Sequence, residues 1–188
     1  MREDLVKAVE EAKVEKRIVP ALFKGALETI DKNLLEKETV NYVIGVNVGI
    51  LSTGEALKIN PFTFKNKKAG ILAVTSVRII HCFTVLFNKN VEQILLEDIN
   101  NIESKSSFMA SVLRIQSMTN VMEIDINNKE VVKVTKLLHE LKEKRNSAPQ
   151  IVNNISSADE LAKFKKLLDD GILTQEEFDK KKAQILGI

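Results

Sequence analysis

The stretch that decides the fold is residues 121–126, Val-Met-Glu-Ile-Asp-Ile. Apolar and charged residues alternate along it, which is the period-two pattern of a β-strand with one face toward a core. We expect Met122, Ile124 and Ile126 to point inward, and Glu123 and Asp125 to point outward. Leu113 and Ile115 alternate with polar neighbours in the same way, so a second strand precedes this one.

A helix is expected directly after the 121–126 strand. Asn128 suits its N-cap, and the apolar residues that follow at helical spacing are Val131, Val134, Leu138 and Leu141. Towards the N-terminus, further short strands are expected at 69–74, 77–83, 91–96 and 99–102, separated by turn residues. A run of about seven short strands closed by one helix predicts an α+β protein with an antiparallel sheet or barrel.

Helical spacing marks both ends of the chain. Near the N-terminus, Leu5, Val9 and Ala12 recur at helical spacing and indicate a first helix. Pro20 suits the first turn of a second helix. The apolar stripe of that helix is Leu22, Phe23, Ala26, Leu27, Ile30 and Leu34. The stripe is expected to pack on the barrel, although pairing of these helices between subunits is an open alternative. Near the C-terminus, Ser157 with Glu160 and Thr174 with Glu177 have the spacing of capping boxes, so a helical hairpin is expected.

The expected domains follow from these patterns. They are a helical extension at 1–38, a barrel at 39–146, a polar linker at 147–156 and a small helical hairpin at 157–188. The last helix carries three consecutive lysines from Lys180, but neighbouring carboxylates offset their charge.

Composition excludes several classes of protein. The 188 residues carry a net charge of +2, which lacks the basic field of a dedicated nucleic-acid binder. The single Cys82 excludes an internal disulfide framework and a multi-cysteine zinc site, and it suits a reducing compartment. The uncharged run at 39–54 is too short to span a bilayer, and Glu3 and Asp4 stand where a signal peptide needs basic residues. We therefore expect a cytoplasmic protein.

No pattern in the sequence predicts catalysis. Residues 49–54 have the glycine spacing of a phosphate loop, but Glu55 occupies the position of the essential lysine, so a strand end and hairpin loop is expected. His81 and Cys82 are adjacent on a strand and must face opposite sides. They are interpreted as a surface histidine and a core thiol, and His139 as a second surface histidine. We expect no catalytic, cofactor-binding or metal-binding residues, hence no enzyme.

Two stretches resemble known families. Residues 157–186 closely resemble the SHOCT module, with its hallmark pattern running from Phe164 to Phe178. The stretches 69–80 and 94–99 are similar to bacterial PH-like domains of the YokE type. This resemblance implies a split seven-stranded barrel closed by its last helix, without catalytic residues. For SHOCT modules it implies oligomerisation or peptide contact.

Two surfaces are candidates for binding. The expected loop between the first two strands carries Lys58, Lys65, Lys67 and Lys68, together with Phe62 and Phe64. In many eukaryotic PH domains this loop binds inositol phosphates, so contact with a lipid or another anion is one hypothesis, and a solvated loop the favoured one. The hairpin is too small to hide its apolar face, which comprises Leu161, Phe164, Leu167, Leu168, Phe178, Ile185 and Leu186.

The sequence therefore favours a non-enzymatic bacterial or prophage interaction protein. Its expected partner is another protein or a second copy of itself, as a homo-oligomer. An adaptor for anionic membranes is the second hypothesis, and nucleic acid is disfavoured.

Overall fold

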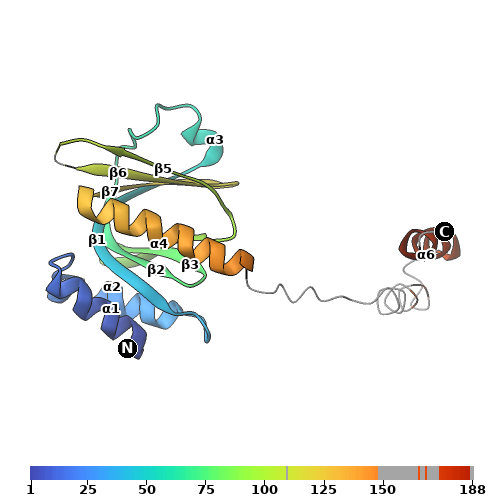
Figure 1. Ribbon diagram of the computed structural model, residues 1–188, viewed down its shortest axis with the longest axis horizontal. Helices are drawn as coiled ribbons and strands as arrows, with labels where there is room; N and C mark the ends of the chain where they lie inside the picture. The colour runs from blue at the N-terminus through green and yellow to red at the C-terminus, as the bar shows by residue number, and fades with distance from the viewer. Residues whose placement is uncertain (109, 148–164, 166–167, 169–173, 187–188) are drawn as a thin grey trace. The chain divides into compact units, whose positions relative to one another are not determined.

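The computed structural model describes residues 1–108, 110–147, 165, 168 and 174–186 (Figure 1). The chain divides into two compact units, Met1–Lys144 and Arg145–Ile188. The first unit contains two N-terminal helices, a seven-stranded sheet and the long helix α4 (Asn128–Ser147). In the second unit, the described helix is α6 (Gln175–Leu186).

The seven strands form one antiparallel sheet in the order β4-β3-β2-β1-β7-β6-β5. Their bounds are β1 (Val40–Ser52), β2 (Lys68–Thr75), β3 (Arg78–Val85), β4 (Asn88–Leu95), β5 (Ile99–Ser106), β6 (Ser111–Ser117) and β7 (Asn120–Ile126). The long strand β1 joins the two halves, because it pairs with β2 from Val40 to Val48 and with β7 from Asn47 to Ser52. Strands β4 and β5 are the two edges, so the barrel is split. The predicted α+β class, with a split antiparallel barrel of seven strands followed by one helix, is confirmed.

The main core fills the inside of the curved sheet. Met122, Ile124 and Ile126 of β7 contribute to it, as the alternating pattern predicted. Helix α4 adds its buried apolar face, which consists of Val131, Val134, Leu138 and Leu141. The helix is capped by Asn127, whose Oδ1 accepts the Glu130 N–H at 2.9 Å. The prediction of Asn128 as the cap was wrong by one residue: the Asn128 side chain instead contacts Ser111 and the Ser107 carbonyl.

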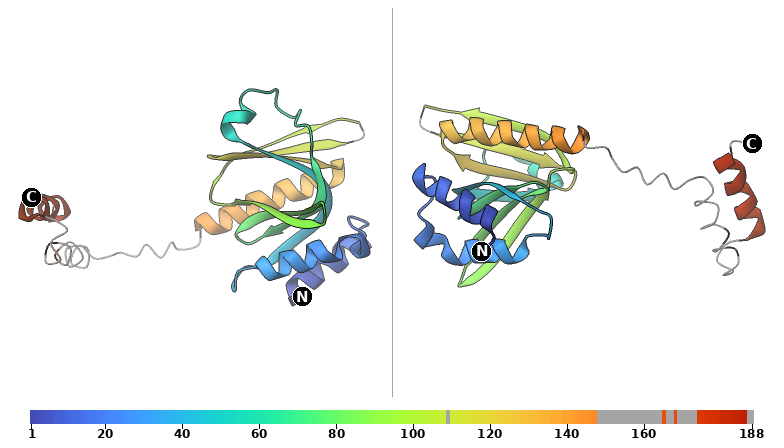
Figure 2. Two further views of the ribbon diagram at one scale, coloured as in Figure 1. Left: turned by 180° about the vertical axis from the view of Figure 1, so that it is seen from behind. Right: turned by 60° about the horizontal axis from the view of Figure 1, so that its bottom comes forward.

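The N-terminal helices cover the outer face of the sheet. Helices α1 (Glu3–Val14) and α2 (Pro20–Asn33) lie against β1, β2 and β3 (Figure 2). They form a second core with Ile71, Ala73, Ile80 and Cys82. The predicted packing on the barrel is confirmed, with Pro20 in the first turn of α2. One member of the predicted stripe is misplaced, since Leu22 is 76% exposed.

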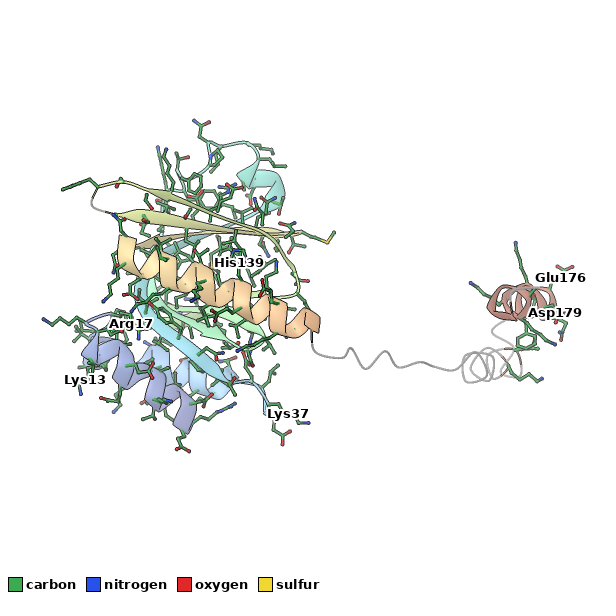
Figure 3. The ribbon with its side chains drawn as sticks, in the orientation of Figure 1. Lys13, Arg17, Lys37, His139, Glu176 and Asp179 are labelled. Carbon is green, nitrogen blue, oxygen red and sulfur yellow. The ribbon has the colours of Figure 1, made fainter. Side chains whose placement is uncertain are left out.

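Arg17, in the connection between these helices, completes the hydrogen bonding of β1 (Figure 3). Strand β7 pairs with β1 only from Asn47 onward. Before that point the Gly45 N–H donates to the Arg17 carbonyl at 3.1 Å, and Arg17 Nη1 donates to the Val43 carbonyl at 2.9 Å. The connection therefore takes the place of a neighbouring strand beside the first half of β1, where β7 does not pair.

Residues 49–54 do not form a phosphate loop. Gly49 lies in β1, and the one-turn helix α3 (Thr53–Ala56) follows the strand. Ser52 and Glu55 form a reciprocal capping box at the start of α3. The expected strand end is confirmed, and Glu55 has a structural role because its side chain accepts the Ser52 N–H at 3.2 Å.

Candidate functional site

The β1–β2 loop, residues 53–67, folds over the outer face of the sheet at β7. Two of its backbone N–H groups, those of Phe62 and Phe64, donate to the carboxylate of Glu123 at 2.6 and 2.9 Å. Glu123 is fully buried under this loop. Glu123 is on the outward face of β7, as predicted, but the loop covers that face, so its carboxylate is not exposed to solvent.

Arg114 on β6 balances the buried charge of Glu123. Its Nη1 lies 2.5 Å from Glu123 Oε1, and its guanidinium lies 5.4 Å from the centre of the Phe64 ring. Phe64 is itself buried in a small apolar cluster with Ala56 and Val121. The loop is thus held by a buried ion pair, two backbone hydrogen bonds and an aromatic anchor.

The four candidate lysines of the loop differ in their surroundings. Lys67 Nζ lies 2.5 Å from Asp125 and 3.9 Å from Glu123, and its side chain is only 11% exposed. Lys58, Lys65 and Lys68 are exposed, and no salt bridge joins them to a carboxylate of the described residues. The surface available to an anionic ligand therefore contains three of the four predicted lysines, because Lys67 is part of the framework.

A second buried ion pair joins the start of β3 to the segment before β1. Arg78 donates from Nε and Nη2 to the two carboxylate oxygens of Glu38 at 2.9 and 2.8 Å. Thr75 Oγ1 also donates to Glu38, at 2.7 Å, and the Leu35 N–H does so at 2.9 Å. Burial raises the pKa of Glu38, but these hydrogen bonds outweigh it and hold the pKa below its ordinary value. Thr75 and Arg78 belong to the stretch that resembles PH-like domains, and their role here is structural.

His81 and Cys82 face opposite sides of β3, as predicted. Cys82 belongs to the core beneath the N-terminal helices, and burial raises the pKa of its thiol, which disfavours a reactive thiolate. The expectation of a surface histidine at position 81 was wrong. His81 is fully buried, its ring is stacked on Phe83 at 5.0 Å, and its Nδ1 lies 3.3 Å from Glu92 Oε2.

His139 is exposed on α4, as expected (Figure 3). Among the described residues, no three side chains of the metal-binding types gather at one point.

The C-terminal candidate face is only partly described. Helix α6 begins directly after Thr174, where the capping pattern predicted its start, and the Phe178 N–H donates to the Thr174 carbonyl at 3.1 Å. Leu168 and Phe178 are half-buried. Leu161, Phe164 and Leu167, with most of the first predicted helix, lie outside the described residues, as do the side chains of Ile185 and Leu186.

The structure also reveals an exposed apolar turn that sequence reasoning missed. Leu86 and Phe87 connect β3 to β4, with 84% and 98% of their surfaces exposed. The sequence predicted a turn at the asparagines of 88–90, because asparagine is a common turn residue. Neither leucine nor phenylalanine is typical of a tight turn, so nothing in the sequence indicated a turn at these two positions.

Comparisons with known proteins assign the C-terminal segment. Residues 159–186 match the family model of the SHOCT module, the Short C-terminal domain. No curated protein matches the chain. None of the described helices is long and apolar enough to cross a membrane.

Several solved structures are similar to part of the chain. The Vps36 N-terminal PH domain has 17% identity and a TM-score of 0.45, over 61% of this chain and 86% of that chain. The hSac2 domain from the human phosphoinositide phosphatase Sac2 has 10% identity and a TM-score of 0.45, over 69% and 85%. The fold class itself rests on the strand order and the terminal helix described above.

Proposed function

We propose that this protein is a non-enzymatic interaction protein of a bacterium or prophage that acts in the cytoplasm. Its PH-like barrel binds protein, and its SHOCT segment mediates self-association or contact with a partner. The observation that carries the proposal is the SHOCT match at 159–186 in a chain whose other unit is a PH-like barrel. The resemblance to bacterial PH-like domains of the YokE type supports the same function.

The buried charges of the barrel support a non-catalytic function. Glu123 is engaged by Arg114 and two backbone N–H groups, and Glu38 by Arg78. Each carboxylate is hydrogen-bonded on both oxygens, so neither is positioned as a free base for an external substrate.

Size and composition support association through the SHOCT segment. A helical hairpin of about 30 residues without a disulfide or metal rarely buries enough apolar surface to fold alone. Phe178 on α6 remains half-buried. A second surface, either another copy of the hairpin or a partner protein, would remove this apolar face from water.

The test is the solution mass from light scattering. We expect removal of 157–188 to lower the oligomeric mass while the barrel remains folded. Phe178→Asp should have the same effect, because it places a charge in the contact. Lys180→Asp introduces the same side chain at an exposed position of α6 and should leave the mass unchanged. If the full and truncated chains are both monomeric, self-association is wrong.

A second candidate function is an adaptor for anionic lipid headgroups. The observation that favours it is the exposure of Lys58, Lys65 and Lys68 on one loop. Each lysine near an anionic membrane contributes about 1 kcal/mol. Changing all three to Glu should abolish co-sedimentation with anionic vesicles, whereas wild-type protein that fails to bind at low salt would exclude this function.

A further inference from the structure

The β3–β4 turn is unusual in both composition and conformation. Strand β3 ends at Val85 and β4 begins at Asn88, and the two residues are paired, so Leu86 and Phe87 form the entire turn. Their φ angles of 47° and 72° are both in the left-handed region, as in a type I′ turn. Asn-Gly is preferred there because bulky side chains are strained at positive φ. This turn instead holds two large apolar side chains in water.

Two lysines lie near this turn. Lys89 on β4 is paired with Thr84, and its Nζ donates to Thr84 Oγ1 at 3.0 Å. The β2–β3 pairing ends at Gly70 and Phe83, so Lys68 at the start of β2 lies toward the same end of the sheet as the turn. Both lysines are exposed, and no salt bridge joins them to a carboxylate within the described part of the chain.

The start of helix α2 extends the same surface. Leu22 lines a cavity of about 220 Å³ together with Thr84 and Lys89, so the first turn of α2 lies beside the hairpin. Leu22 is 76% exposed, and Lys24 is exposed close to it. The nearest carboxylate on β4, that of Glu92, faces His81 at 3.3 Å. The protruding apolar residues are therefore bordered by lysines.

We propose that the β3–β4 turn inserts into the interface of an anionic lipid bilayer, with Leu86 and Phe87 among the acyl chains. Lys68 and Lys89 would lie at the headgroups, because lysine stems can pack along apolar surface while their ammonium groups remain in water. A convex pair of exposed side chains fits a fluid bilayer without a complementary pocket, and the bordering cations match the charge of anionic lipids. The inserting residues belong to a different hairpin from the basic loop, but Lys68 is shared with the anionic-lipid function proposed above. A variant of the turn that keeps Lys58, Lys65 and Lys68 therefore separates failure of insertion from failure of headgroup binding.

The decisive variant is Leu86→Asn with Phe87→Gly. It installs the preferred type I′ turn, so we expect its thermal unfolding midpoint to be equal to or above that of the wild type. Binding to vesicles of phosphatidylcholine with phosphatidylglycerol should fall by about tenfold or more, because two apolar side chains are lost. Phe108→Ser removes an equally exposed phenylalanine from the β5–β6 turn and should leave binding unchanged. Equal binding by the turn variant and the wild type would overturn the proposal.

Fluorescence can report insertion directly. The chain contains no tryptophan, so a single introduced tryptophan is the only source of indole emission. Phe87→Trp should show a blue-shifted emission on addition of anionic vesicles and quenching by brominated acyl chains. Phe108→Trp, as the matched control, should keep the emission of a water-exposed indole. Unchanged emission at position 87, or equal shifts at both positions, would contradict insertion through this turn.

The lysines supply a third measurement. Lys68→Glu and Lys89→Glu should each weaken binding about fivefold or more at low salt, and vesicles of phosphatidylcholine alone should bind poorly. Failure of the wild-type chain to bind anionic vesicles at low salt would overturn the proposal and favour a protein pocket as the partner of this turn.

Discussion

Single residues at the outer rim of the barrel show how charge is buried in this fold. Glu123 lies on the outward face of β7 and Glu38 lies in the segment before β1, yet both are almost fully buried. Each is paired with an arginine, Arg78 or Arg114, and also accepts backbone N–H groups. A buried ion pair of this kind is costly to break from one side, because the remaining charge has no partner.

Glu38→Gln tests this cost. The substitution leaves Arg78 buried without its counter-charge and should lower the free energy of unfolding by about 3 kcal/mol at pH 7. Because the folded-state pKa of Glu38 lies below its ordinary value of 4.5, its contribution is fully present above pH 4.5 and is lost as the pH falls through the folded-state pKa. Urea denaturation from pH 7 to pH 3 should therefore show the difference between wild type and variant shrinking. A constant difference over that range would contradict the assignment.

Tyr42 provides a spectroscopic test, since it is the only tyrosine in the chain. Burial, followed by the hydrogen bond that its hydroxyl donates to Glu130, raises its pKa well above the ordinary value of 10.0. Absorbance at tyrosinate wavelengths should stay low in the native protein above pH 10 and appear with unfolding. The linked stability is present below pH 10 and declines as the pH rises further. Titration near pH 10 in the folded state would show that the hydroxyl is solvated.

These residues also mark the limit of sequence reasoning. The period-two pattern identified the faces of β6 and β7 correctly, so Met122, Ile124 and Ile126 could be placed in the core. It could not reveal that a loop some 60 residues earlier in the chain covers the opposite face at Glu123, because that contact is tertiary. The burial of His81 escaped for the same reason. For the candidate site, the sequence located the basic loop but could not separate the paired Lys67 from its exposed neighbours.

At the scale of elements, the connections between helices and strands make specific contacts, as the strands themselves do. Pro20 and the helical stripes predicted both N-terminal helices, but not that Arg17 between them bonds to the unpaired edge of β1. The short α3 and the β3–β4 turn were likewise missed, since each depends on one or two residues. Patterns that repeat over many residues were predictable, whereas local substitutes for a missing strand were not.

Arg17→Met isolates the role of this connection. Methionine keeps an apolar stem beside Tyr42, but it cannot donate to the Val43 carbonyl, and it removes a cation 3.9 Å from Glu130, which keeps Lys133 at 3.6 Å. We expect a loss of about 1–3 kcal/mol in the free energy of unfolding by urea, because the Val43 carbonyl is left without its donor. Lys16→Gly is the control: Lys16 has a φ of 57°, which glycine adopts without strain, so its stability should be equal or slightly higher. An unchanged midpoint for Arg17→Met would show that water replaces the guanidinium.

At the scale of the whole molecule, the barrel and the N-terminal helices form one folding unit. The unit Met1–Lys144 contains both apolar cores, and the outer core consists of residues from α1, α2 and strands β1 to β3. The succession of about seven short strands and the terminal helix could be predicted from the sequence because their signals repeat over many residues. The sequence could not predict whether the helices cover their own barrel or another subunit. Amphipathic spacing shows that a face is buried, but it does not show what buries it.

Deletion of residues 1–36 is the test at this scale. It removes both helices, exposes Ile71, Ile80 and Cys82 of the sheet to water, and takes Arg17 from the edge of β1. Each fully buried large apolar side chain contributes about 1.5–3 kcal/mol, so losing several exceeds the stability of a typical domain. The truncated chain should aggregate or unfold at a markedly lower temperature. Deletion of 149–188 removes a similar length but lies outside the first unit, so its thermal midpoint should match that of the full chain. A soluble, monodisperse 37–188 chain with an unchanged midpoint would mean that the outer core is dispensable and that the helices serve a partner instead.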